Sequence, residues 1–354
     1  MNVQGAAIGL RDEAEVVQRR TIHPLNALDH QPYLTAAGIN LPLPGDALTE
    51  PWTHYDGSGV QFIDVEQGWD VSHQAFNEPV RDQDPGVFSI DAASHGNAVL
   101  GIVMANGASS RIRGIAPGCT LKGLYAPRGD VPWQEGLEVA IRLAAESLGA
   151  GDVLLIPLQI HDTLLPVEVE VGVFRAIRYA VSKGIIVIEA AGNQRIPLED
   201  ELRDTPGRMP AWTDIDDVPR FHGFPDSGAI IVGGCVARKN AGRYDKPKQG
   251  RDTRVGARVD CCAWSQSVWT SFGMASKYGY FSHTSASSPI IAGLALLVQQ
   301  CAKEHLGRPL SAAEMRELFR DPACGTAVDP IDPAYPINMP DACKLFKKLE
   351  QAPN

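Results

Sequence analysis

From residue 59 onward, short apolar runs alternate with longer segments of helical periodicity. Strands are predicted at 60–65, 120–125, 153–157, 184–189 and 229–232, and helices at 96–105, 133–148 and 171–182. Short apolar strands separated by helices indicate a parallel sheet that is covered on both faces. We therefore expect an α/β fold with three layers, in which a doubly wound, mostly parallel sheet carries helices on both faces.

A serine-rich stretch at 281–288 runs directly into an apolar segment at 290–298. Thr284 and Ser285 lie where a helix cap is expected, and Pro289 is tolerated in a first turn because its missing N–H has no helical partner there. The apolar residues cover all sides of the helix, which predicts that it is buried. Ser285 is then either a plain cap residue or a group placed beside free N–H donors that can stabilise an oxyanion.

Three more polar residues stand at the ends of apolar segments. Asp64 closes the first strand, His95 precedes the helix predicted at 96–105, and Asn193 follows the strand at 184–189. Ligand sites of parallel sheets lie beyond the carboxyl ends of the strands. Each residue alone has an ordinary interpretation as a turn or cap residue, but their joint occurrence predicts a site that contains Asp64, His95, Asn193 and Ser285.

The order Asp64, His95, Ser285 resembles that of the subtilisin class of serine peptidases. The stretches that carry the resemblance are His95-Gly-Asn-Ala-Val-Leu-Gly101, Ala190-Ala-Gly-Asn193 and His283-Thr-Ser-Ala-Ser-Ser-Pro289. It extends over about residues 55 to 328 and implies a subtilisin-like fold. It also implies Ser285 as nucleophile, His95 as base, Asp64 as the group that orients His95, and Asn193 as an oxyanion donor.

The resemblance predicts a serine endopeptidase of restricted specificity that processes a peptide or protein. The alternatives are a peptide ligase or macrocyclase on the same triad, or a non-catalytic peptide-binding homologue. The predicted substrate-binding residues are Leu158, Gln159, Ala190, Ala191 and Gly192.

One stretch and one single residue near this groove depart from the family. Pro157-Leu158-Gln159-Ile160 stands where the family has Ser-Leu-Gly-Gly, so we expect a narrowed or reshaped substrate edge. His283 stands where the family has glycine, and its imidazole is expected either to crowd the leaving-group side or to hydrogen-bond near Ser285. A change to glycine with unchanged kinetics would show that it is a passive replacement.

Two charged features have competing interpretations. Glu189, inside the strand at 184–189, is either a structural, hydrogen-bonded carboxyl or a selector of basic substrate side chains. The segments 195–227 and 238–258 are predicted to be long surface loops beside the cleft. The second loop is rich in lysine and arginine, and we interpret these residues as a solvated face.

The chain has 354 residues and divides into an extended arm at 1–50, a peptidase domain at 51–328 and a tail at 329–354 with a short helix near 342–349. Its net charge of −10 disfavours nucleic acid and anionic membranes as partners. No stretch approaches the roughly 20 apolar residues of a membrane span. A peptide or protein substrate is the expected partner, and nothing in the sequence indicates an oligomeric state.

Seven scattered cysteines contain no Cys-x-x-Cys pair, so free thiols are expected rather than disulfides or a zinc site. No calcium loop is recognisable. We therefore predict neither a metal nor a cofactor. Residues 1–10 lack the positive region of a signal peptide, which predicts a cytoplasmic protein or one whose leader has been trimmed.

Overall fold

The computed structural model describes residues 30–42, 55–77, 89–107, 110–194, 220–221, 224–240 and 243–352. Its helices are α2 (Ile90–Met104), α3 (Trp133–Ser147), α4 (Val171–Ser182), α7 (Thr284–Leu306), α8 (Ala312–Arg320) and α9 (Ala342–Glu350), with short 3₁₀ turns η2 (Pro32–Leu34), η3 (Val167–Val169) and η4 (Pro322–Cys324). The main strands are β1 (Gln61–Val65), β2 (Thr120–Tyr125), β3 (Val153–Ile156), β4 (Ile186–Ala190), β7 (Ile230–Val236), β10 (Lys248–Gln249) and β11 (Cys261–Trp264). The smaller hairpins are β5 (Arg220–Phe221) with β6 (Phe224–Pro225), β8 (Lys239–Asn240) with β9 (Arg243–Tyr244), β12 (Val268–Ser271) with β13 (Tyr278–Phe281), and β14 (Gly325–Val328) with β15 (Ile337–Pro340).

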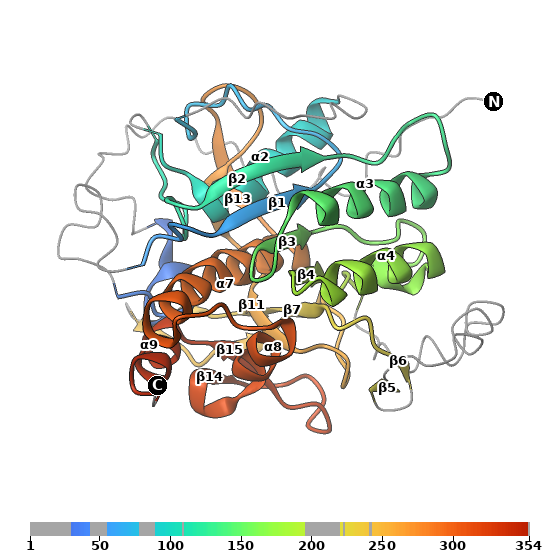
Figure 1. Ribbon diagram of the computed structural model, residues 1–354. Helices are drawn as coiled ribbons and strands as arrows, with labels where there is room; N and C mark the ends of the chain where they lie inside the picture. Colours follow the sequence, from blue (N-terminus) through green and yellow to red (C-terminus); the bar gives the residue numbers. More distant parts are fainter. Residues whose placement is uncertain are drawn as a thin grey trace.

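One seven-stranded sheet forms the centre of the molecule (Figure 1). Its strands run in the order β2, β1, β3, β4, β7, with β11 parallel to β7 and the short β10 antiparallel to it. All pairs except β10–β7 are parallel. The carboxyl ends of β1, β3 and β4 therefore reach the same edge, which is where the sequence places its candidate site residues.

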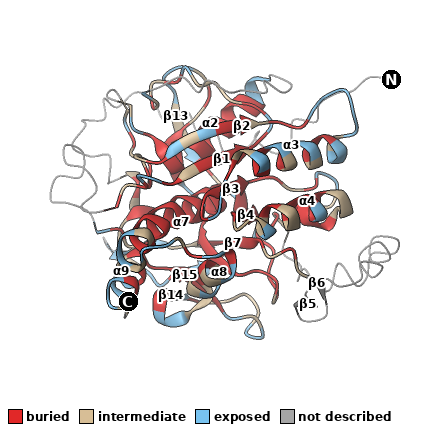
Figure 2. Cartoon of the chain, viewed as in Figure 1, coloured by how far each residue is buried: buried red, intermediate tan, exposed pale blue. Residues whose placement is uncertain are grey.

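Alternate side chains of β1, β3 and β4 enter two separate cores. Phe62 of β1 and Leu155 of β3 belong to the core under α2 and α7, whereas Ile63 and Leu154 belong to the core under α3 and α4. Figure 2 shows both layers of helices with their buried sides toward the sheet. The predicted three-layer α/β architecture is confirmed.

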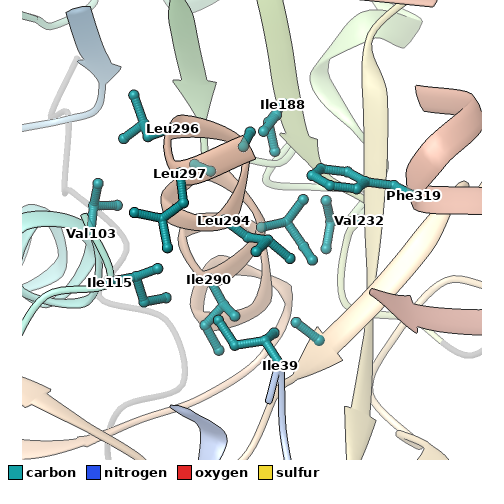
Figure 3. Packing of buried hydrophobic residues seen from close by; sticks show 14 of the residues in the cluster. Ile39, Val103, Ile115, Ile188, Val232, Ile290, Leu294, Leu296, Leu297 and Phe319 are labelled. Carbon is teal, nitrogen blue, oxygen red and sulfur yellow. The ribbon is translucent and has the colours of Figure 1, made fainter. Parts of the chain in front are cut away.

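Helix α7 crosses the larger core. Its side chains are buried from Thr284 to Ala302, and Ile290, Leu294 and Leu297 project among residues of the sheet, α2 and α8 (Figure 3). In the described part of the chain it is also the single helix whose length and apolarity would suit a membrane span, but 94% of its apolar window is buried inside the structure. A buried core helix explains this composition as well.

Two helices begin elsewhere than the sequence predicted. Helix α2 begins at Ile90 rather than near Gly96, because the Ser89 side chain accepts the Ala92 N–H and caps the helix six residues earlier. His95 therefore lies within α2. Helix α7 begins at Thr284, so Pro289 lies inside the helix rather than in its first turn.

The described parts of the two chain ends meet beside α7. Tyr33, Leu34 and Ile39 are buried in the larger core, and the Ala342 N–H donates to the Ile39 carbonyl. The predicted C-terminal helix is observed as α9, whereas the first 29 residues lie outside the described part of the chain. All seven cysteines are free, as expected, and Cys343 alone among them is not buried.

Candidate active site

The loop that follows β1 is held against α2. Gly96 lies so close to this loop that a Cβ there would come 2.2 Å from the Gly68 carbonyl oxygen and 2.6 Å from the Trp69 ring. One residue further along α2, the Asn97 side chain accepts the Asp70 N–H at 2.9 Å and donates to the Gly273 carbonyl at 2.7 Å. The glycine and the asparagine of the histidine motif thus fix the end of β1 beside His95.

This arrangement brings Glu66 to His95. Glu66 is the first residue after β1, its side chain is fully buried, and its Oε1 is hydrogen-bonded to His95 Nδ1. The second oxygen of the carboxylate accepts the Gln67 N–H at 2.7 Å. His95 keeps 30% of its side chain exposed, and its ring meets that of Phe281 edge to face at 5.0 Å. Glu66 therefore orients the imidazole through Nδ1 and leaves the second ring nitrogen, Nε2, free of this bond.

The prediction that Asp64 orients His95 is wrong. Asp64 is fully buried, and its Oδ2 accepts the Trp69 indole N–H at 2.9 Å. Among the described residues its Oδ1 has no hydrogen-bond partner. Asp64 and Glu66 are two residues apart and point to the same face, so the sequence pattern fits either one. The packing of Trp69 against Asp64 decides between them.

Glu66 influences both Asp64 and the imidazole. Burial raises the pKa of Asp64 well above its ordinary value, the negative charge of Glu66 raises it further, and the Trp69 bond lowers it only in part. Burial acts to lower the pKa of His95, but attraction and hydrogen bonding to Glu66 prevail and raise it. Burial beside the charge of Glu66 thus favours the protonated form of Asp64, and the same charge stabilises the imidazolium of His95.

Ser285 is the second residue of α7, so its N–H is among the four that a helix leaves without an intrahelical acceptor. Its hydroxyl donates to the Pro157 carbonyl, just beyond β3, at 3.0 Å. The hydroxyl must therefore change rotamer before His95 can take its proton.

His283, the residue before α7, is exposed and has φ of 70° and ψ of −172°. This combination of backbone dihedral angles is close to exclusive to glycine, and a residue with a side chain that adopts it carries backbone strain of about 1–3 kcal/mol. The two expected roles of the His283 ring stay predictions.

Asn193 follows β4, as predicted, and faces the start of α7. Its Oδ1 accepts both the Thr284 N–H at 3.0 Å and the Thr284 hydroxyl at 2.7 Å. Because Oδ1 is the acceptor of both bonds, the side-chain N–H₂ group points away from Thr284. The backbone N–H of Asn193 donates to the Gln159 side chain at 3.1 Å, which links the segments after β3 and β4.

Four of the five predicted substrate residues, namely Leu158, Ala190, Ala191 and Gly192, are buried. Gln159 is partly exposed and pairs with Pro166 of its own chain in an antiparallel bridge. The Ile160 N–H donates to the Leu165 carbonyl, which closes a tight turn beside this edge. Substrate binding by these residues and the expected reshaping of the substrate edge stay predictions.

Arg254 was missed as a residue that organises this region. It is fully buried, although its loop was predicted to be a solvated face. Its guanidinium donates to the Thr163 carbonyl and the Gln194 side chain, both at 2.7 Å. The backbone N–H of Arg254 donates to the Gly192 carbonyl at 3.0 Å. Arg254 thereby ties the turn after Gln159 to the segment that carries Asn193. Most of the other predicted loop, residues 195–219, lies outside the described residues.

Glu189 follows the structural interpretation. It is fully buried in β4, and its Oε2 accepts the Glu168 N–H at 3.2 Å. Burial first, and then the charge of Glu168, raise the pKa of Glu189 well above its ordinary value, against the opposing effect of Arg258. A buried carboxyl in this position is closed to substrate side chains.

Comparison with known proteins identifies the family. The sequence model of the subtilase family matches residues 29–336. The chain belongs to the subtilase family. The predicted resemblance is therefore confirmed.

Solved structures of subtilases share the fold. A protease from Pseudoalteromonas arctica is 18% identical, with a TM-score of 0.64, and the alignment covers 91% of this chain and 97% of that chain. Sphericase is 19% identical, with a TM-score of 0.57 over 81% of this chain and 92% of that chain.

A sequence relative is the nisin leader peptide-processing serine protease NisP of Lactococcus lactis subsp. lactis. It is 33% identical over 149 residues, which are 40% of this chain and 20% of NisP. The match thus spans about a fifth of the length of that relative.

Proposed function

We propose that this subtilase is a serine endopeptidase whose triad consists of Glu66, His95 and Ser285. The observation that carries the proposal is the hydrogen bond between His95 Nδ1 and the buried Glu66 carboxylate. It fixes the tautomer in which the other ring nitrogen is the free acceptor, as a general base requires. Ser285 stands at the start of the helix that packs against α2, which carries His95.

The reaction then follows from these groups. Ser285 Oγ turns from the Pro157 carbonyl, gives its proton to His95 Nε2 and attacks the carbonyl carbon of the substrate. His95 passes that proton to the leaving amine as the C–N bond breaks. Water, activated by the same imidazole, then hydrolyses the acyl-enzyme. Glu66 stabilises the imidazolium in both halves of the reaction.

The oxyanion is assigned to the Ser285 N–H and the Asn193 amide. Removal of one such donor costs about 2.7–4 kcal/mol in the barrier. Asn193→Ala is therefore expected to lose about 100- to 1000-fold in kcat with little change in KM. Steady-state kinetics on one peptide substrate measure this, and an unchanged kcat removes Asn193 from the mechanism.

Restricted specificity is part of the proposal. The substrate edge beside Ser285 is engaged by its own chain through the Gln159–Pro166 bridge and is held by Arg254. Such an edge favours selected peptides over general proteolysis. The relative NisP is described as processing a leader peptide, and we propose a processing role on a peptide or protein for this chain as well.

Labelling with a fluorophosphonate tests the nucleophile. Wild-type protein and Ser288→Ala should be labelled, and Ser285→Ala should not. Ser288 is a matched control because its hydroxyl, three residues along the same helix, is buried and has no hydrogen-bond partner among the described residues. Absence of labelling in the wild type would favour a non-catalytic binding protein.

Mass analysis of the products of a peptide library tests the reaction class. Hydrolysis adds one water to each cleaved peptide, whereas ligation or macrocyclisation joins an amine to the acyl group. Products that arise only by amine transfer would replace the endopeptidase proposal with that of a ligase.

A further inference from the structure

The far end of α7 holds a second group of reactive side chains. Cys301 and His305 are four residues apart near the end of α7, so they lie on one face of the helix. Glu350, the last residue of α9, reaches the same place. The ligand atoms of Cys301, His305 and Glu350 all lie within 4.8 Å of one another.

Tyr55 connects this group. Its hydroxyl lies 3.0 Å from His305 Nε2 and 3.0 Å from Glu350 Oε1. The Tyr55 ring packs on Phe346 of α9 at 4.7 Å and meets the His305 ring edge to face at 6.5 Å. Three segments that are remote in the sequence therefore converge on one cluster of a thiol, an imidazole and a carboxylate.

The dimensions of the cluster suit a tetrahedral ion. Zinc binds nitrogen and oxygen ligands at about 2.0–2.2 Å and sulfur at about 2.3 Å, so neighbouring ligand atoms of a tetrahedral site are roughly 3.3–3.8 Å apart. The three ligand atoms lie within 4.8 Å of one another, so the largest separation the cluster allows is about 1 Å beyond this range. Small side-chain movements are enough to admit an ion.

The chemistry of the ligands selects among ions. A thiolate together with an imidazole favours zinc or another late first-row metal over magnesium or calcium. We propose that Cys301, His305 and Glu350 bind one zinc-class divalent ion, with water in the fourth position. Tyr55 keeps its hydrogen bond to Glu350, while His305 Nε2 turns from the Tyr55 hydroxyl to the ion.

Binding at this site releases a proton. Burial raises the pKa of the Cys301 thiol to about 11, although its hydrogen bond with Tyr55 acts in the opposite direction. At neutral pH the metal-free protein therefore holds a thiol, and the ion displaces its proton when the S–metal bond forms.

The site joins the end of α7 to α9 and to the segment of Tyr55, so its expected effect is on stability. An ion that binds only the folded chain shifts the unfolding equilibrium toward the folded state. At one hundred times Kd, zinc should raise Tm by at least about 3 °C. This inference is independent of the peptidase proposal, because every readout is metal binding or unfolding.

Cobalt is the probe of choice, since a cobalt–thiolate bond gives a near-ultraviolet charge-transfer band. Chelator-treated, tag-free protein in a non-thiol reductant should bind one cobalt per chain with that band, and zinc should abolish it. Cys301→Ser should lose the band and bind at least about tenfold more weakly. Cys343→Ser is the matched control, because its thiol is also in the C-terminal region but bonds the Asn40 carbonyl, and it should bind as the wild type does.

Glu350→Gln gives a second test, because this exposed residue at the end of a helix can change without loss of the fold. It should also weaken cobalt binding at least about tenfold, with unchanged circular dichroism. The proposal is overturned if stoichiometric cobalt binding is not observed, if binding occurs without the thiolate band, or if affinity is equal in wild type and both variants. Any of these results would leave a hydrogen-bonded clamp and no metal site.

Discussion

Two pairs of buried carboxyl groups lie near the carboxyl ends of β1 and β4, and they have opposite surroundings. In the first pair Asp64 bonds Trp69, and Glu66 faces His95, whose side chain is 30% exposed. Glu168 and Glu189 face Arg258, whose side chain is 3% exposed. In each pair burial and a neighbouring charge raise the pKa of one member, Asp64 or Glu189.

The cation decides what each pair can do. An imidazole exchanges protons near neutral pH, and the open face of His95 can reach a substrate. A guanidinium keeps its charge, and Arg258 is closed in by hydrogen bonds of 2.9 Å to Glu168 and 2.9 Å to Asp260. The first pair is thus suited to catalysis. The second is suited to holding η3 and β4 to the segment of Arg258 and Asp260 that leads into β11.

The largest expected effect comes from Glu66→Gln. Loss of the charge that fixes the His95 tautomer should lower kcat by about 10⁴-fold. Circular dichroism should stay unchanged, since the amide is isosteric with the carboxylate. Kinetics on a peptide substrate measure this. A loss below about tenfold would show that Glu66 does not act through His95.

The equivalent change at the other pair should damage stability instead. Arg258→Met leaves Glu168 and Asp260 buried without this partner and is expected to cost about 3–5 kcal/mol of unfolding free energy. Urea denaturation measures the loss. The folded fraction should keep a kcat within about threefold of wild type, because Arg258 touches no reacting group. A folded but inactive variant would contradict the distinction between the two pairs.

Asp64→Asn separates the two members of the first pair. A neutral amide can replace a protonated carboxyl and still accept the Trp69 N–H, so kcat should change less than about tenfold. This variant is also the matched control for Glu66→Gln. If the two variants lose activity equally, both carboxyls support His95 as ionised groups.

The smallest expected effect is a shift of the pH profile. Only neutral His95 accepts the Ser285 proton, so kcat/KM should fall as the pH decreases through the raised pKa of His95. The midpoint of the acid limb of the kcat/KM profile should lie above 6.5, the ordinary pKa of histidine. In Glu66→Gln this midpoint should move to lower pH. A wild-type limb at or below 6.5 would mean that burial of His95 outweighs the attraction of Glu66.

The same pKa has a consequence for stability. The pKa of His95 is raised on folding. The Glu66–His95 pair therefore makes its full contribution to the free energy of unfolding at pH values below the pKa that His95 has in the unfolded chain. This contribution is lost as the pH rises through the raised pKa of the folded chain. Thermal unfolding across this range should therefore show a smaller contribution from the pair at alkaline pH.

The sequence alone determined the layers of the fold, because strand and helix periodicities are local and each apolar run needs cover on both faces. It also predicted that His95, Asn193 and Ser285 belong to one site, since chain order and strand ends restrict where they can lie. Only the tertiary structure decided between Asp64 and Glu66. Both point to the same face, and the choice depends on how the Gly68–Trp69 turn packs on Gly96 of α2. The convergence of Cys301, His305 and Glu350 is likewise tertiary: the helical spacing of the first two is visible in the sequence, but the third arrives only when α9 folds against α7.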